Sequence, residues 1–241
     1  MSMQVNNIKH AFNRAAQTYD EHCLLQQKTG ADLLDLLNPQ VTLPKNIIDI
    51  GCGTGINTEQ LVNQYPHSSM YALDFADKLL QRAELRLAGK KVQLIESDFD
   101  SWQGGHSNFD VIYSNLALHW SVDLFAILNK LIAMLNFNGV LAFSVPLVGT
   151  LEELSKRLLV RHFYSNEEIC SLISAFNFSY ETEVITQHYS DSFSALKSIK
   201  TVGASFVKPS SKHGLRGKAF LKNLELRKLT YVIGYFIVKK N

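Results

Sequence analysis

The sequence predicts an α/β fold built on a mostly parallel sheet, and two observations support this prediction. Between residues 46 and 146, short apolar segments alternate with amphipathic helical segments, which is the pattern of parallel strands joined by crossover helices. The chain of 241 residues is 46% hydrophobic and 19% charged. This composition supports one large folded domain and excludes a disordered regulator.

Five strands and three helices make up this alternation. The strands are expected at residues 46–50, 69–74, 91–97, 109–114 and 139–145. The helices are expected at residues 56–64, 76–87 and 124–135. The sequence Asn136-Phe137-Asn138-Gly139 predicts the end of the third helix, because Asn and Gly favour helix C-termini.

Other elements flank this core. Residues 7–37 are compatible with helix. Further along, Thr150 with Glu153 and Ser165 with Glu168 match the S/T-x-x-E capping box, so a helix is expected to begin at each place.

The last quarter of the chain is expected to hold a strand at residues 180–189, a helix at 193–202 and a strand at 231–239. The final strand is as apolar as the core strands, so we expect it to join the main sheet. Residues 190–228 would then be inserted over one edge of that sheet.

The sequence also indicates the cellular compartment in which the protein is expected. The longest apolar runs are about half of the roughly 20 residues that a membrane-spanning helix needs. The first ten residues are polar and do not resemble a secretory signal. Cys23, Cys52 and Cys170 form no C-x-x-C pair, which argues against a disulfide framework or a zinc site. We therefore expect a cytoplasmic protein without a bound metal.

The net charge of +2 is unevenly distributed. Residues 191–241 contain 11 Lys and Arg against 2 Asp and Glu. Such a cluster suits an anionic partner, although a solvated lysine-rich surface explains it equally well.

The segment NIIDIGCGTG at residues 46–55 is the most informative motif. Gly51, Gly53 and Gly55 follow a predicted strand and precede a predicted helix, so the backbone can turn tightly and approach a ligand. Ile56 breaks the GxGxxG spacing of a dinucleotide fingerprint, and the Gly-Lys-Ser/Thr of a P-loop is missing.

Acidic residues complete a different pattern around this loop. Asp49 lies two residues before the first glycine, and Asp74 ends the second strand, where a carboxylate can accept hydrogen bonds from two ribose hydroxyls. Asp98 and Phe99 follow the third strand and could contact an adenine. The series predicts a cleft that fits a nucleoside.

These stretches resemble the class I S-adenosylmethionine-dependent methyltransferases. The matching segments are IIDIGCGTG, ALDFADKLL, SDF and FDVIYSNLALHW. The resemblance implies a Rossmann-like sheet of seven strands with the last one antiparallel, and S-adenosylmethionine as methyl donor. It also implies that Phe75 and Leu116 join Asp49, Asp74, Asp98, Phe99 and the three glycines as cofactor-binding residues.

Two further stretches are similar to the malonyl-acyl carrier protein O-methyltransferases of biotin synthesis. AFNRAAQTYDEH is similar to that family's FxRAAxxYxxH, and FSALKSIKTVGA to its LSAMRSLKGIGA. The resemblance implies an enzyme that methylates the free carboxylate of malonyl-acyl carrier protein. Methylation of a free acid such as trans-aconitate, RNA methylation and a non-catalytic cofactor-binding role remain alternatives.

This resemblance suggests roles for particular residues. Tyr19 and Asn115 are the candidate catalytic residues, and Arg14 could orient a carboxylate. Each has an ordinary explanation: Tyr19 could pack on the sheet, and Arg14 could form a salt bridge. Lys197 and Lys200 fall on one helical face and could contact the acidic carrier protein, unless that face is simply solvated.

The predicted organisation is a single methyltransferase domain over residues 1–241. Within it we expect an N-terminal helical cap at 1–40, a cofactor-binding core at 46–146, a substrate or helical lid region at 147–229 and the last strand at 230–241.

Overall fold

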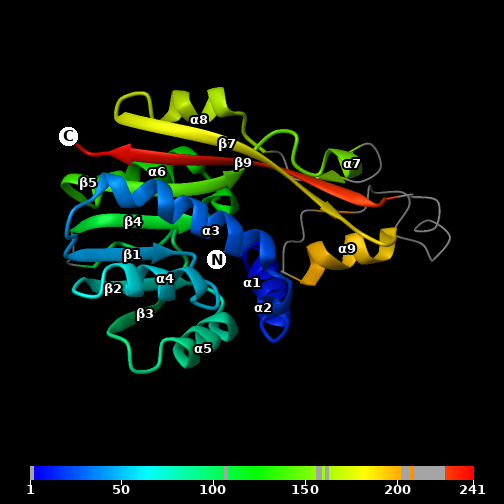
Figure 1. Cartoon of the computed structure of the whole chain (residues 1–241), viewed down its shortest axis with the longest axis horizontal. Helices are drawn as coiled ribbons and strands as arrows, with labels where there is room; N and C mark the ends of the chain where they lie inside the picture. Colours follow the sequence, from blue (N-terminus) through cyan, green and yellow to red (C-terminus); the bar gives the residue numbers. More distant parts are fainter. Residues whose placement is uncertain (1–2, 106–107, 156–158, 161–162, 202–206, 209–225) are drawn as a thin grey trace.

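A computed structural model of the chain describes residues 3–105, 108–155, 159–160, 163–201, 207–208 and 226–241. Within these residues, a seven-stranded sheet forms the centre of the molecule (Figure 1). Its strands are β1 (Asn46–Ile50), β2 (Ser69–Asp74), β3 (Val92–Glu96), β4 (Phe109–Asn115), β5 (Leu135–Pro146), β7 (Asn177–His188) and β9 (Lys228–Lys239). Two short strands, β6 (Leu159–Val160) and β8 (Val207–Lys208), pair with each other.

The strand order is β3-β2-β1-β4-β5-β9-β7. The first five strands in this order run parallel, whereas β9 is antiparallel to both of its neighbours, β5 and β7. This arrangement confirms the expected Rossmann-like, mostly parallel sheet of seven strands. It also brings the carboxyl ends of β1, β2, β3 and β4 to one edge, where ligands bind in sheets of this kind.

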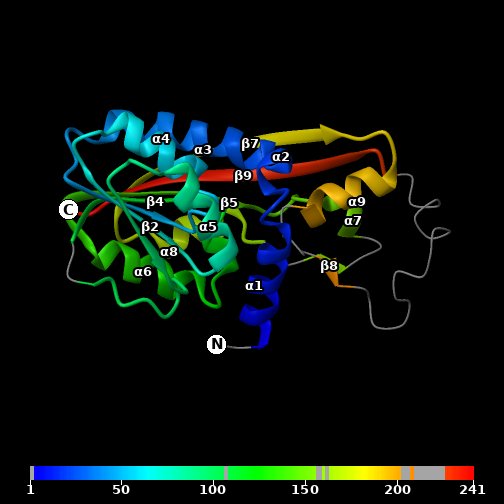
Figure 2. The ribbon, with the colours of Figure 1, turned by 90° about the horizontal axis from the view of Figure 1, so that it is seen from below.

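Helices cover both faces of the sheet. They are α1 (Met3–Ala15), α2 (Tyr19–His22), α3 (Leu24–Leu37), α4 (Ile56–Gln64), α5 (Asp77–Arg86), α6 (Leu124–Ala133), α7 (Glu152–Ser155), α8 (Asn166–Leu172) and α9 (Ser192–Thr201), with the 3₁₀ turns η1 (Asn38–Gln40) and η2 (Leu118–Trp120). Figure 2 shows α3 and α4 on one face, α6 and α8 on the other, and α1 across the edge near the strand ends.

The two faces bury separate parts of the core. On one face, Leu33 and Leu37 of α3 pack with Tyr113 of β4, and the Tyr113 hydroxyl donates a hydrogen bond of 2.7 Å to the backbone oxygen of Gly30. On the other face, the apolar side of α6 packs against β4 and β5 around Phe143. Apolar residues on both sides of the strands explain why the strand sequences show no polar alternation.

The sheet extends beyond β5 at one end. Residues 233–239 of β9 pair with β5, whereas residues 228–232 pair only with β7. The resulting two-stranded extension carries α9 beside it (Figure 1). Ala195 and Ile199 bury one side of α9, so the helix has a fixed inner face.

Most predicted elements are found within one to three residues of their expected bounds, and β1, β2 and α4 match them. The predicted end of the third helix was wrong. Helix α6 ends at Ala133, and Asn136-Phe137-Asn138-Gly139 belongs to β5, with a register shift opposite Phe109. Asn138 adopts a left-handed backbone with φ of 62°, which Asn tolerates, so the segment forms an irregularity in a strand instead of a loop.

A helix does begin at the first predicted capping box, because α7 starts at Glu152, but the two side chains of the box have another role. The Thr150 side chain exchanges hydrogen bonds with the backbone of Val232, and the Glu153 carboxylate accepts from Thr230, so both side chains bind β9. The second box is confirmed, because Ser165 and Glu168 make both reciprocal bonds at the start of α8. Residue 202 and the basic stretch at 209–225 lie outside the described residues.

Replacing Leu33 with Ala tests the packing of α3. Leu33 is fully buried, so its truncation should lower the free energy of unfolding by about 2–5 kcal/mol. Leu24 of the same helix is 68% exposed, and Leu24→Ala should change stability by less than about 0.5 kcal/mol. Urea unfolding followed by circular dichroism measures both. Similar losses for the two variants would contradict the described seat of α3 on the sheet.

Candidate active site

The glycine loop turns sharply where β1 ends. Gly51, Gly53 and Gly55 have φ values of 76°, 56° and 80°, a region that favours glycine. The backbone N–H groups of Gly51 and Cys52 both donate to the Leu73 oxygen of β2. A side chain at Gly51 would collide with Ala117, so the loop is built for close approach of its backbone.

Asp74 holds this loop against the end of β2. One carboxylate oxygen accepts from the Gly53 N–H at 2.9 Å, and the other accepts from the Ala76 N–H at 2.8 Å. The side chain is buried, and burial raises the pKa of the Asp74 carboxyl to about 6, although the backbone donors oppose that shift. The Phe75 N–H is a third backbone donor to this carboxylate, which has about four lone-pair sites and so can still accept from a ligand.

A cavity of about 670 Å³ opens beside this carboxylate; we call it the donor cavity. It brings together most of the residues that the sequence predicted for the cofactor. The predicted residues on its wall are Tyr19, Gly51, Gly53, Asp74, Phe75, Asp98, Phe99, Asn115 and Leu116. Its remaining wall includes Ile8 and Phe12 of α1, so the first helix covers a site formed by the strand ends.

Asp49 and Gly55 lie behind this wall instead of on it. The Asp49 carboxylate is buried and accepts a hydrogen bond of 2.6 Å from the Thr58 hydroxyl of α4. Burial raises the pKa of Asp49 to about 7. Gly55 is the N-cap of α4 and packs against Ala83. Both residues therefore shape the loop and its helix from the inner side.

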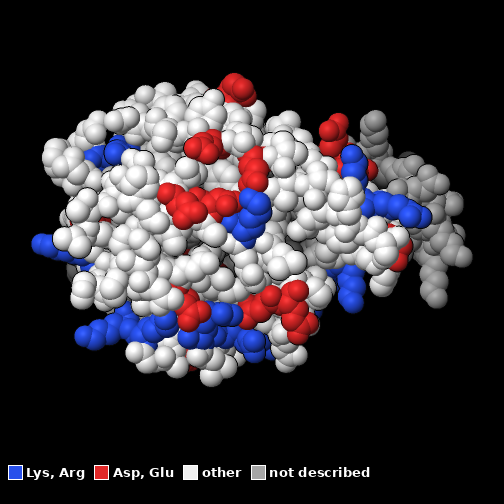
Figure 3. All heavy atoms as spheres, viewed as in Figure 1, with Lys and Arg blue, Asp and Glu red and all other residues white. Residues whose placement is uncertain are grey.

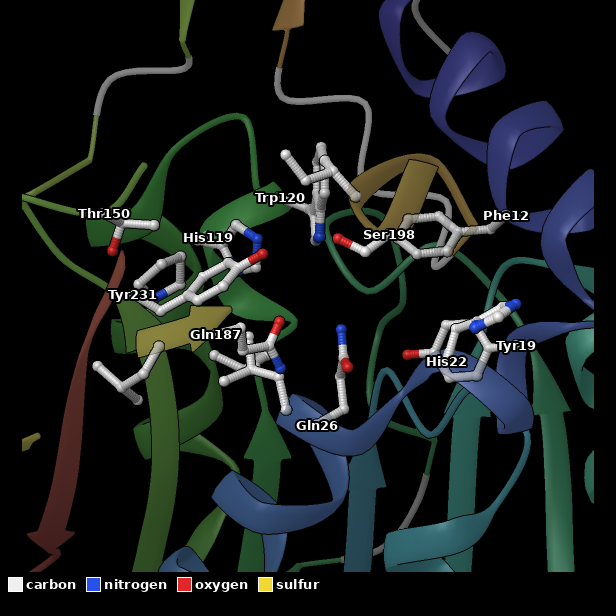
Figure 4. A pocket seen from close by; sticks show the side chains of 15 residues that line it. Phe12, Tyr19, His22, Gln26, His119, Trp120, Thr150, Gln187, Ser198 and Tyr231 are labelled. Carbon is white, nitrogen blue, oxygen red and sulfur yellow. The ribbon is translucent and has the colours of Figure 1, made fainter. Parts of the chain in front are cut away.

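A second opening of about 690 Å³ adjoins the donor cavity; we call it the acceptor cleft. The two share Phe12, Tyr19, Leu116 and Trp120 on their walls. Figure 4 shows the Tyr19 hydroxyl and the side chains of Gln26 and Gln187 pointing into the cleft. Two adjoining spaces with a shared wall can hold two reactants next to each other.

Tyr19 lies at the junction of the two spaces. Burial raises the pKa of its hydroxyl, so it stays protonated at neutral pH. The next residue, Asp20, anchors this segment to the glycine loop. Its carboxylate accepts from the Thr54 hydroxyl at 2.6 Å and pairs with Arg86 at 2.7 Å. Arg86 also donates to the Thr54 backbone oxygen, so three elements meet at Asp20.

Asn115 lines the donor cavity, but its amide is occupied by protein partners. Its nitrogen donates to the backbone oxygen of Gln26 at 2.8 Å and to the side-chain oxygen of Asn57 at 3.1 Å. Its oxygen accepts from the Ser144 hydroxyl at 2.7 Å. The observed bonds fix α3 against β4 and β5, so the amide of Asn115 is engaged by the protein although the residue lines the cavity.

The predicted basic residues lie outside both spaces. Arg14 is exposed on α1 and lines neither the donor cavity nor the acceptor cleft. Lys197 and Lys200 are exposed on the outer side of α9, while Ser198 between them lines the cleft. Figure 3 shows basic side chains at the end of the molecule that carries α9.

Several residues of the acceptor cleft were not predicted from the sequence. They include Gln26, Thr150, Gln187, Ser198 and Tyr231. These residues come from α3, α9, strands β7 and β9 and the segment after β5. Ser198 lies in the segment FSALKSIKTVGA and Thr150 in the first capping box, but neither pattern indicated a place in a cleft. Gln26 and Gln187 belong to no recognised motif, and the placement of the β7–β9 extension brings them to the same space. Phe12 was within reach of prediction, because it lies in the quoted segment AFNRAAQTYDEH.

The described residues contain no group of three or more His, Cys, Asp or Glu side chains arranged to hold a metal ion. None of their helices has both the length and the apolar character needed to cross a bilayer.

Known structures and a family model match this architecture. A family described as "Methyltransferase domain" matches residues 47–139. The plantazolicin methyltransferase BpumL, solved in complex with SAH, superposes with a TM-score of 0.60 at 14% identity, over 98% of this chain and 96% of that one. N-methyltransferase NodS from Bradyrhizobium japonicum gives a TM-score of 0.54 at 13% identity, over 94% and 98%.

The fold and the site together define a class I S-adenosylmethionine-dependent methyltransferase. Similarity in sequence goes further. Malonyl-acyl-carrier protein O-methyltransferase 2 of Coxiella burnetii is 35% identical over 99% of both chains. The malonyl-acyl-carrier protein O-methyltransferase of Salmonella typhimurium is 30% identical over 92% of this chain and 90% of its own. The chain belongs to the malonyl-acyl carrier protein O-methyltransferase family.

The pKa of Asp74 predicts how affinity for S-adenosylmethionine depends on pH. The ionised carboxylate accepts hydroxyl hydrogen bonds, so affinity should be constant above about pH 7 and weaken as the pH falls through 6. Asp74→Asn cannot ionise. It should weaken binding about 100-fold at pH 8 and remove this pH dependence. Calorimetric titration at pH 5 to 8 measures both effects.

Asp35, which is exposed on α3, supplies the control, since Asp35→Asn should reproduce the wild-type titration. A wild-type dissociation constant that stays the same from pH 5 to 8 would remove Asp74 from the donor site.

Proposed function

We propose that this protein transfers a methyl group from S-adenosylmethionine to the free carboxylate of malonyl-acyl carrier protein, an early step of biotin synthesis. One observation carries the proposal: the donor cavity and the acceptor cleft lie next to each other and share Tyr19 and Leu116 on their walls. Its relatives supply the acceptor, since both are malonyl-acyl-carrier protein O-methyltransferases by name.

The residues on the wall of the donor cavity fit the chemistry of S-adenosylmethionine. Asp74 would accept hydrogen bonds from the ribose hydroxyls, and Asp98 with Phe99 would hold the adenine. Gly51 and Gly53 have no side chains, so they would let the amino-acid portion approach the backbone of the loop closely. When bound, S-adenosylmethionine supplies an electrophilic methyl group on a positively charged sulfur.

The acceptor needs no general base in this reaction. A malonyl carboxyl group has a pKa near that of side-chain acids, so it is ionised and nucleophilic at neutral pH. The protein therefore contributes mainly by alignment, for which effective molarities reach about 10⁵ M or more. Tyr19, which contacts both spaces, would set the approach of the acceptor, and its protonated hydroxyl can donate a hydrogen bond.

Asn115 would support catalysis indirectly, by holding the wall between the two spaces in place. Its amide joins β4 to α3 and α4, and Leu116 next to it lies on the wall shared by the two spaces. Leu116 has a left-handed backbone with φ of 49°, an uncommon conformation for this residue, and its N–H donates to the Ser144 side chain. A fixed turn at this point would keep the distance between the donor and the acceptor constant.

The carrier protein would dock on α9. Acyl carrier proteins are acidic, and Lys197 and Lys200 present two exposed positive charges beside the acceptor cleft. Arg14 lies on α1, outside the cleft, and would contribute to the same electrostatic attraction without touching the malonyl group. Such attraction raises the association rate and weakens with salt.

Parallel assays of methyl transfer test the acceptor. Purified protein and labelled S-adenosylmethionine are incubated separately with malonyl-acyl carrier protein, malonyl-coenzyme A, trans-aconitate and RNA. We expect the highest kcat/KM with the carrier-bound substrate, because it fills both the cleft and the α9 surface. Label that appears only on RNA or only on trans-aconitate would refute the proposal, and donor binding without any transfer would favour a non-catalytic role.

Charge reversal on α9 tests the docking surface. Lys197→Glu with Lys200→Glu should raise the KM for malonyl-acyl carrier protein about 10-fold at low salt, and change that for malonyl-coenzyme A much less. The control reverses Lys91 and Lys239, which lie at the opposite edge of the sheet. Equal effects on the two substrates, or equal effects of the two double variants, would contradict docking on α9.

A further inference from the structure

The acceptor cleft is polar without being formally charged. Its wall within the described residues contains no Lys, Arg, Asp or Glu side chain, although the proposed acceptor is an anion. Its polar groups are amides, hydroxyls and imidazoles. The residues that provide them are Tyr19, His22, Gln26, His119, Thr150, Gln187, Ser198 and Tyr231.

A network of hydroxyl groups orients Gln187. The Tyr189 hydroxyl donates to the Gln187 side-chain oxygen at 2.7 Å and accepts from the Ser198 hydroxyl at 2.8 Å. Tyr231 also hydrogen-bonds to Tyr189, and burial raises the pKa of both phenols. Because the Gln187 oxygen is occupied by a donor, its amide N–H₂ is the end left to bind a ligand in the cleft.

Gln26 approaches the same space from α3. Its side-chain oxygen is buried and has no hydrogen-bond partner among the described residues. Figure 4 shows its amide nitrogen pointing into the cleft, with the Tyr19 hydroxyl and the Gln187 amide directed to the same space. Gln26 also borders the small opening beside the glycine loop, so it lies on the donor side of the cleft.

The helix turn that carries Gln26 is held rigidly. Its backbone oxygen accepts from Asn115 at 2.8 Å, and one turn later the Gly30 oxygen accepts from Tyr113 at 2.7 Å. Gly30 itself lies against Asn57, where a larger residue would collide. A side chain on such a support can present a donor without paying much conformational entropy on binding.

We propose that Gln26, together with Gln187, binds the acceptor carboxylate through neutral amide N–H groups. This inference rests on the proposed function and names the acceptor-binding residues of its cleft. Neutral donors orient the anion without a full ion pair, so the carboxylate keeps the charge density that it needs as a nucleophile. The Tyr19 hydroxyl adds a third neutral donor at the junction with the donor cavity.

Binding measurements with a charged and an uncharged ligand test this assignment. The ligands are malonyl-acyl carrier protein and its methyl ester, each titrated calorimetrically in the presence of S-adenosylhomocysteine. Gln26→Glu keeps the size of the side chain and adds a negative charge. It should weaken binding of the malonyl form about 100-fold and change binding of the methyl ester less than about 3-fold.

Two more variants separate recognition from structural damage. Gln26→Met removes the donors without adding charge and should raise the KM for malonyl-acyl carrier protein about 10-fold. Gln17→Glu, an exposed position between α1 and α2, makes the same charge change outside the cleft and should leave every constant unchanged. The dissociation constant for S-adenosylhomocysteine should stay within 2-fold of wild type in all three variants.

The outcomes distinguish this inference from the proposed function. Equal losses of the malonyl and ester ligands in Gln26→Glu, or no loss of either, would refute carboxylate recognition by Gln26. If the wild-type protein methylates trans-aconitate but not malonyl-acyl carrier protein, the proposed function fails, and the same comparison is made with that acid and its methyl ester. An acceptor without a carboxylate would overturn both.

Discussion

The carboxylate of Asp74 is the constraint on which the site depends. It closes the glycine loop through the Gly53 N–H and fixes the start of the next segment through the Ala76 N–H. Such a buried group is costly to ionise, which is why its pKa is raised to about 6. The same side chain therefore shapes the loop and provides acceptors to the donor cavity, so structure and ligand recognition cannot be varied independently there.

The N-terminal helices turn this open edge into two defined spaces. Phe12 of α1 makes edge-on ring contacts with Phe75 and Trp120, and Asp20 binds Thr54 and Arg86. These contacts join the first twenty residues to the loop, to η2 and to α5. Catalysis by alignment requires such fixed surroundings, because its benefit is lost when either reactant can move. The protein needs few reactive side chains for this chemistry.

The sequence predicted the fold, and most of the residues that it predicted for the donor line one cavity, whereas it indicated few residues of the acceptor cleft. Core strands and the glycine loop are encoded locally by apolar runs and by backbone conformations that favour glycine. Two predicted roles were wrong because tertiary contacts decide them. Thr150 bonds to β9 instead of capping a helix, and Asp49 bonds to Thr58 instead of lining the cavity. Gln26 and Gln187 meet only because the β7–β9 extension passes α3, which no local pattern encodes.

The close contact between Gly30 and Asn57 connects the protein core to the proposed acceptor-binding residue Gln26, although Gly30 does not touch the cleft. Gly30 lines neither space, yet a side chain there would displace Asn57, whose amide oxygen accepts from Asn115 and whose nitrogen donates to Gln60. Loss of those bonds would release the helix turn that carries Gln26. A substitution at position 30 or 57 would therefore change the support of Gln26 without touching either space, because these two positions and position 115 form one packed and hydrogen-bonded set.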